Sequence, residues 1–218
     1  MKITDMGEVF TNVTVMYPRM DKTYKFDSIE NRTVPCKPEE DGSAYEVSFV
    51  IDKKEAKELH DRAMELFEAA AKKDDKRKWP DKPTYMPMKK SDDGTVYTVK
   101  AKLKGNYSGD ITRPPLQLDA KREPLPADFQ LTTNSKCNVW GVMFAYNTGA
   151  VCGVSFRLKG VQVLELAEMV ASGDPFEEES GYTAGSSDSD PFGLPEIKKE
   201  AKEEPAKASA DFDDEIPW

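Results

Sequence analysis

The sequence has few of the residues that build metal centres and disulfide frameworks. Its 218 residues include three cysteines and one histidine. Cys36, Cys137 and Cys152 form no Cys-x-x-Cys motif, and an odd number of thiols without paired spacing is typical of reduced cysteines in a cytosolic protein. We therefore expect no bound metal. The single histidine, His60, is interpreted as structural, because catalysis would need partners within reach.

Long apolar runs and familiar catalytic motifs are also missing. No stretch approaches the roughly 20 apolar residues of a membrane span, and residues 1–5 lack the apolar run of a signal peptide. There is no Walker loop and no glycine-rich dinucleotide motif. The acids Glu46, Asp110 and Asp119 are scattered, whereas a two-metal nuclease needs acids placed at strand ends. We expect a soluble intracellular protein with no membrane contact, no catalytic residues and no cofactor.

Negative charge is concentrated in the last part of the chain. Residues 1–170 contain 27 basic and 26 acidic side chains, whereas residues 171–218 contain 4 and 14. Residues 171–210 are acidic and rich in Ser, Gly and Pro, so they cannot bury a core. We predict a folded domain over 1–170, a disordered acidic linker over 171–210 and a tip at 211–218. A nearly neutral body beside an acidic tail favours a body that binds a polyanion.

Alternating apolar residues predict five strands in the body. These strands lie within residues 9–17, 45–51, 95–104, 139–146 and 150–166. In the first strand, the residues on one face are Val9, Thr11, Val13, Val15 and Tyr17. The last two strands are joined by Asn147-Thr148-Gly149, which suits a short turn. Gly160 indicates a bulge or bend in the last strand.

One helix is predicted between the second and third strands. Asp52 and Glu55 form an N-terminal capping pair. Apolar residues then recur at helical spacing, namely Leu59, Ala63, Leu66, Phe67 and Ala70. An all-β domain with one inserted helix is best accommodated by the OB-fold, a five-stranded barrel. An immunoglobulin-like sandwich is the alternative, although such sandwiches usually lack this helix.

Basic residues line one face of the third predicted strand. Lys100, Lys102 and Lys104 alternate with apolar neighbours, and same-face positions are roughly 6.8 Å apart. This spacing is comparable to the phosphate spacing of an extended single strand of nucleic acid. The row therefore favours contact with DNA phosphates, with a solvated outer face that discourages strand pairing as the alternative.

Aromatic and basic residues in the last two strands extend this candidate surface. Trp140 and Tyr146 fall on one parity with Phe144, and exposed rings stack on bases regardless of sequence. The alternative is that these rings fill the barrel. Arg157 and Lys159 lie on the predicted outer face of the last strand. We predict that both contact DNA together with the lysine row.

The tip combines acidic, apolar and aromatic side chains at the end of the sequence. In order, it consists of Asp211, Phe212, Asp213, Asp214, Glu215, Ile216, Pro217 and Trp218. It closely resembles the C-terminal peptide of bacterial single-stranded DNA-binding proteins, Asp-Phe-Asp-Asp-Asp-Ile-Pro-Phe. Six of the eight positions match, and the departures at Glu215 and Trp218 keep the charge and the aromatic end. The resemblance implies that the whole tip binds partner proteins, whereas acidity alone would suit a solubilising tail.

The last predicted hairpin resembles that of the single-stranded DNA-binding proteins of tailed bacteriophages. The resemblance covers residues 146–151, 153–158 and 161–166, and it leaves residues 18–44 and 74–94 unmatched. It implies an OB-fold with an inserted helix and an acidic, aromatic-ended tail. It also implies that an aromatic residue near this hairpin contacts DNA, and this role falls on Tyr146.

These observations predict a non-enzymatic, sequence-independent binder of single-stranded DNA in phage-type replication and recombination, acting in the bacterial cytoplasm. The tail is expected to recruit a polymerase, helicase or exonuclease through the tip and to compete with DNA for the groove. An adaptor that uses the tip to hijack host replication proteins is the chief alternative, and a metal-dependent nuclease is the enzymatic one. The sequence leaves the oligomeric state open, a homodimer included.

Overall fold

The computed structural model describes residues 1–92 and 94–168; the predicted acidic linker and tip lie outside the described residues. The described elements follow one another as β1 (Lys2–Thr4), β2 (Gly7–Asp27), β3 (Arg32–Pro35), β4 (Ala44–Ile51), α1 (Lys53–Lys73), β5 (Met88–Lys90), β6 (Tyr97–Lys104), β7 (Asn106–Tyr107), β8 (Asp110–Ile111), β9 (Leu116–Leu118), β10 (Lys136–Asn147) and β11 (Cys152–Glu165). None of the helices in this part of the chain is long and apolar enough to cross a bilayer.

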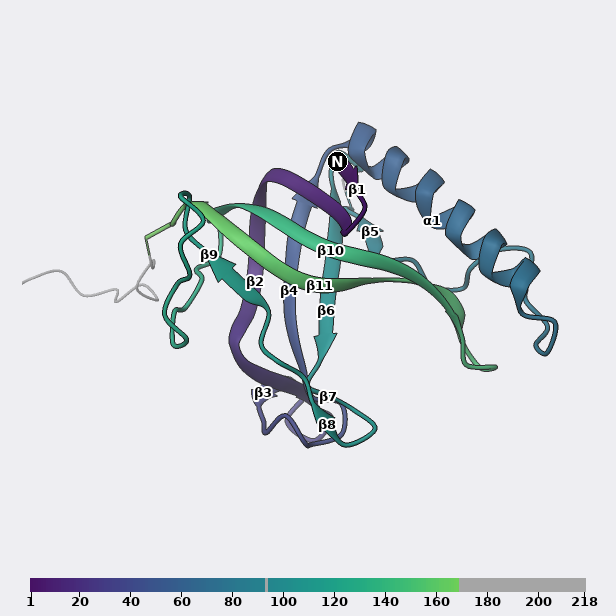
Figure 1. Cartoon of the computed structure of the whole chain (residues 1–218), viewed down its shortest axis with the longest axis horizontal. Coiled ribbons are helices and arrows are strands. Elements are labelled where there is room, and N and C mark those ends of the chain that lie inside the picture. Colours follow the sequence, from purple (N-terminus) through teal and green to yellow (C-terminus); the bar gives the residue numbers. More distant parts are fainter. Residues whose placement is uncertain (93, 169–218) are drawn as a thin grey trace, which may run out of the picture. The chain divides into compact units, whose positions relative to one another are not determined.

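Five strands close into a barrel, which confirms the predicted OB-fold with its inserted helix (Figure 1). β2, β4 and β6 form an antiparallel meander, and β10 pairs antiparallel with both β2 and β11. A parallel pairing of β11 with β6, at Phe156–Ala101 and Arg157–Lys102, closes the ring. A closed ring of this order is the OB-fold arrangement and differs from a two-sheet sandwich.

β4, β6 and β11 keep the predicted alternation, because each has one face on the core and one face outside. Tyr45, Val47, Phe49 and Ile51 of β4 are buried. At the centre of the core, the ring centroids of Phe10 and Phe49 are 4.9 Å apart, and Phe156 packs edge-on against both rings. Burying three phenyl rings at this point makes the barrel interior a packed core.

β2 departs from the predicted alternation. The sequence places Thr11 and Tyr17 on the same face as Val13, but both are exposed, and Phe10 is fully buried. The reason is an irregularity at Asn12, whose φ of 54° is in the left-handed region. Its backbone N–H donates to Oδ1 of Asn138 at 2.9 Å. An extra residue in a strand exchanges the core-facing and solvent-facing sides beyond that point. Tyr17, with a φ of 49°, begins a second irregularity in the pairing with β4.

Helix α1 starts where the sequence predicts. The Asp52 side chain accepts from the backbone N–H of Glu55 at 2.7 Å, which satisfies one of the free donors of the first turn. The Glu55 carboxylate does not return to the cap and instead accepts from the Met1 ammonium at 2.8 Å. The buried face of the helix consists of Ala56, Leu59, Ala63 and Phe67, and it covers β10 and β11. His60 is on the exposed face.

Candidate nucleic-acid interface

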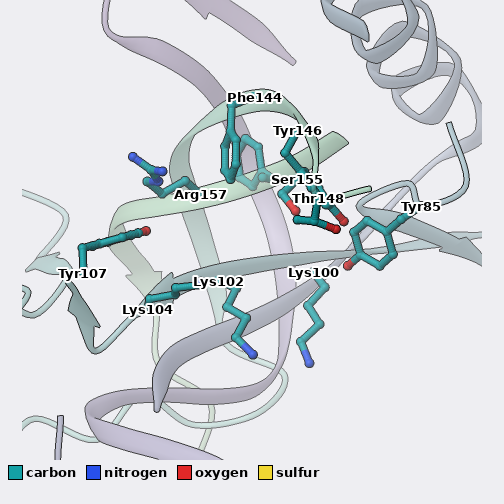
Figure 2. A pocket seen from close by; sticks show the side chains of 11 residues that line it. Tyr85, Lys100, Lys102, Lys104, Tyr107, Phe144, Tyr146, Thr148, Ser155 and Arg157 are labelled. Atoms are coloured by element: carbon teal, nitrogen blue, oxygen red, sulfur yellow. The ribbon is translucent and has the colours of Figure 1, made fainter. Parts of the chain in front are cut away.

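A groove of about 500 Å³ lies on the outer surface of the barrel where β6, β10 and β11 meet (Figure 2). Its walls come from these three strands and from the segments that follow or precede them. The lining residues are Tyr85, Lys100, Lys102, Lys104, Tyr107, Phe144, Tyr146, Thr148, Ser155, Phe156 and Arg157. The groove therefore combines residues that are more than 70 positions apart in the sequence, brought together by barrel closure.

One side of the groove is the lysine row of β6. Lys100, Lys102 and Lys104 are exposed, whereas the intervening Ala101 and Leu103 are buried. The alternation places the three lysines on the same face of the strand, and Figure 2 shows Lys100 and Lys102 extending side by side. Because same-face neighbours in a strand are roughly 6.8 Å apart, the ammonium groups form a regularly spaced basic edge.

Aromatic rings form the other side of the groove. Phe144 and Tyr146 lie on the outer face of β10, with ring centroids 6.1 Å apart, and the Tyr85 ring lies 6.5 Å from that of Tyr146. Ser155, on the neighbouring strand, lies beside Tyr146 (Figure 2). These neighbours hold the Tyr146 ring beside open space that a planar group can enter.

Tyr85 reaches the groove because Gly153 lets its loop approach β11 closely. A Cβ atom at Gly153 would lie 2.4 Å from the Tyr85 carbonyl oxygen, so a larger residue would displace the loop. The same carbonyl accepts from the backbone N–H of Val154 at 3.0 Å, and Thr84 N donates to the Cys152 carbonyl at 2.7 Å.

Arg157 lies between two rings of the groove, those of Phe144 and Tyr107. Its guanidinium carbon lies 4.7 Å from the ring centroid of Phe144 and 5.2 Å from that of Tyr107. A guanidinium at these distances interacts favourably with both ring faces. Its Nε is buried and has no hydrogen-bond partner among residues 1–92 and 94–168. The charged head is therefore positioned by stacking, and its hydrogen-bonding capacity is not used up.

One carboxylate lies among the cations. Glu46, on β4, contacts Lys100 Nζ at 2.9 Å through Oε2 and Lys102 Nζ at 3.1 Å through Oε1. Burial alone would raise the pKa of Glu46, but the two ammonium groups outweigh it and hold that pKa below its usual range. Glu46 is therefore ionised at neutral pH. Burial, and to a lesser extent the Glu46 charge, raises the pKa of Tyr85.

A second cavity continues the groove past the end of β6. It has a volume of about 540 Å³ and shares Lys102, Lys104 and Tyr107 with the first. Its other side is formed by residues 41–43, in the connection before β4, and by Asn106 and Ser108. The two cavities together thus extend from Thr148 in the β10–β11 turn towards the loop between β3 and β4, so they can follow an elongated ligand.

The structure brings together five of the seven predicted DNA-contacting residues. Lys100, Lys102, Lys104, Tyr146 and Arg157 all line the groove. The other two, Trp140 and Lys159, do not line it. Trp140 shares the outer face with Tyr146, but the two are six positions apart along the strand, roughly 20 Å. The Trp140 Nε1–H donates to the Met6 carbonyl at 3.0 Å. Lys159 is exposed at the bulge next to Gly160. DNA contact by each of the seven stays a prediction.

Sequence reasoning missed Tyr85 and Tyr107 and gave Phe144 a lesser role. Phe144 has the same parity as Tyr146, so the pattern already contained its signal. Tyr107 follows the lysine row by three residues, which was a weaker signal. Tyr85 is within a proline-rich loop, and only its pairing with Gly153 places it in the groove.

No family model matches the chain, and no curated protein sequence matches it. Solved structures do. One is the crystal structure of gp2.5, the single-stranded DNA-binding protein of bacteriophage T7. The two sequences are 19% identical, the match covers 81% of this chain and 98% of that chain, and the TM-score is 0.55. The single-stranded DNA-binding protein of bacteriophage Enc34 also matches. Its C-terminal truncation is 17% identical, covers 73% of this chain and 86% of that chain, and gives a TM-score of 0.52.

A structure of the Enc34 protein in complex with single-stranded DNA is 15% identical, covers 73% of this chain and 86% of that chain, and gives a TM-score of 0.53. At these identities the likeness concerns the fold. The chain therefore has the fold of phage single-stranded DNA-binding proteins.

Proposed function

We propose that the protein binds single-stranded DNA without sequence preference, in the groove between the lysine row and the aromatic wall. The observation that carries this proposal is that the three lysines of β6 line the same groove of about 500 Å³ as Tyr85, Phe144 and Tyr146. Ammonium groups bind a phosphate backbone whatever its sequence. Every base has a π-face, so the rings stack on any base, with roughly 1–3 kcal/mol per base.

The position of the groove on the barrel supports this proposal. OB-folds bind oligonucleotides on the face of their second and third strands, with the loops between the first and second and between the fourth and fifth strands at the sides. Here these two strands are β4 and β6, and the two loops are residues 28–43 and 148–151. Of these elements, β6 lines the groove, and the two loops contribute Thr148 to the groove and residues 41–43 to its continuation. The matched phage proteins are described as single-stranded DNA-binding, one of them in complex with DNA.

The proposed role is non-enzymatic and belongs to phage-type DNA replication and recombination in the cytoplasm of a bacterial host. The acidic tail competes with DNA for the groove, because it carries an excess of negative charge beside a basic surface. The tip, residues 211–218, recruits a polymerase, helicase or exonuclease, as its resemblance to the bacterial C-terminal peptide implies.

A fluorescence titration with oligo-dT at two salt concentrations tests DNA binding. Binding that weakens as salt increases is the expected result, because counterions released from the phosphates drive association. A protein that ignores oligo-dT would contradict the proposal and favour an adaptor that acts through its tip. Cleavage of the oligonucleotide in the presence of magnesium would instead indicate a nuclease.

A further inference from the structure

Glu46 lies between cations from both neighbouring strands. The sheet register places it opposite Arg19 of β2 on one side and opposite Lys102 of β6 on the other. Its Oε2 is 2.9 Å from Lys100 Nζ and 3.7 Å from an Arg19 Nη1, and its Oε1 is 3.1 Å from Lys102 Nζ. One carboxylate thus contacts three cationic groups, two of which belong to lysines that line the groove.

We propose that Glu46 is an internal competitor of DNA phosphate, which limits the affinity of the groove for single strands. This inference rests on the proposed function. A carboxylate oxygen accepts from an ammonium group with the same charge-assisted geometry as a phosphate oxygen. In the free protein, Lys100 and Lys102 are therefore already bound to an anion. Lys104, by contrast, has no carboxylate within ion-pair distance in the described part of the chain.

The greater exposure of Lys100 and Lys102 favours competition between Glu46 and DNA phosphate for these lysines. The Glu46 side chain is only 13% exposed, whereas those of Lys100 and Lys102 are 49% and 48% exposed. A lysine head on its four-carbon stem can turn from Glu46 to a phosphate, but the shorter, half-buried Glu46 side chain stays on β4. Its negative charge then lies beneath the bound strand and repels it.

The same geometry makes an opposite hypothesis testable. If Glu46 served mainly to hold the lysines in position, its removal would loosen them and weaken binding. If it competes, its removal frees two ammonium groups and eliminates a repulsion. The sign of the change in affinity distinguishes the two hypotheses. Since affinity changes within one interface occur mostly in the dissociation rate, the competitor would also accelerate release of the strand.

The experiment compares the full-length protein with the Glu46→Gln variant in oligo-dT titrations from low to moderate salt. Glutamine keeps the shape of the side chain and removes one charge. We expect about tenfold tighter binding at low salt and slower dissociation. The salt slope should become steeper by about 0.7, because the groove neutralises one more phosphate. Glu46→Ala, which removes the same charge with a smaller side chain, is measured in parallel, and thermal melts of both variants report the fold.

Glu65→Gln is the matched control. Its carboxylate is on α1, 69% exposed, 3.3 Å from Arg62 and outside the groove, so removing its charge should leave binding unchanged. If the wild-type protein binds oligo-dT but neither Glu46 variant binds it more tightly, the competitor proposal is overturned and the proposed function stands. Failure of the wild-type protein to bind would overturn both.

Discussion

Tyr146 is the residue whose replacement tests the aromatic wall most sharply. Its ring is on the outer face of β10, next to Tyr85 and Phe144, and it lines the groove. We expect Tyr146→Ala to weaken binding of oligo-dT while leaving the salt dependence unchanged, because a stacking surface is lost and no charge is changed.

The magnitude follows from the contacts. Loss of one stacked base is worth roughly 1–3 kcal/mol, which corresponds to about 5- to 150-fold weaker binding. The effect on folding should be smaller. The ring contacts within the protein are worth about 1 kcal/mol, and such a loss lowers the melting temperature by about 2–4 °C in a protein of this size.

Titrations at several salt concentrations and thermal melts measure the two effects separately. Tyr146→Phe keeps the ring and removes only the hydroxyl, so it should bind DNA nearly as well as the wild type. Phe26→Ala removes an aromatic ring that is 63% exposed and outside the groove, so it should have no effect on binding. Wild-type affinity in Tyr146→Ala would refute the stacking role, and a collapse of thermal stability would place the ring in the core.

Three further predictions concern the lysine row, the tail and the tip. Changing Lys100, Lys102 and Lys104 together to Ala should reduce the salt slope by about 2, at roughly 0.7 for each phosphate contact; an unchanged slope would mean that the backbone runs elsewhere. Deleting residues 171–218, which carry 14 acidic and 4 basic side chains, should tighten DNA binding, most strongly at low salt, and equal or weaker binding would refute the competing tail. Deleting Trp218, or adding one residue after it, should leave DNA binding nearly intact but weaken capture of a tip-binding exonuclease, helicase or polymerase in pull-downs. Equal recovery of partners with all three tips would show that the tip only solubilises the protein.

The strands that build the groove were predictable because each has one buried and one exposed face. In β6, the apolar residues Val99 and Ala101 identify the core side, and the lysines therefore had to lie outside. In β10 both faces are apolar, so the sequence alone did not determine which row filled the barrel. Pairing with β2 and β11 decides it, turning Val139 inward and Tyr146 outward.

Features that depend on tertiary contacts were not predictable. The irregularity at Asn12 depends on a hydrogen bond to Asn138, which is distant in sequence. Tyr85 enters the groove only because its loop packs on Gly153. Glu46 was visible as an acid on β4, but its role among the lysines depends on the β4–β6 register. Trp140 and Tyr146 lie on the same face of β10, but a shared face does not place two residues in the same groove when they are far apart along the strand.

The most direct test of the central claim is to locate the DNA on the protein. Ultraviolet cross-linking of oligo-dT to the full-length protein, followed by peptide mapping, reports which aromatic residues contact bases. We expect cross-links in the peptides that contain Tyr85, Phe144 and Tyr146, the rings of the groove wall. Cross-links confined to rings outside the groove, such as the exposed Tyr17 and Phe26, would contradict the account.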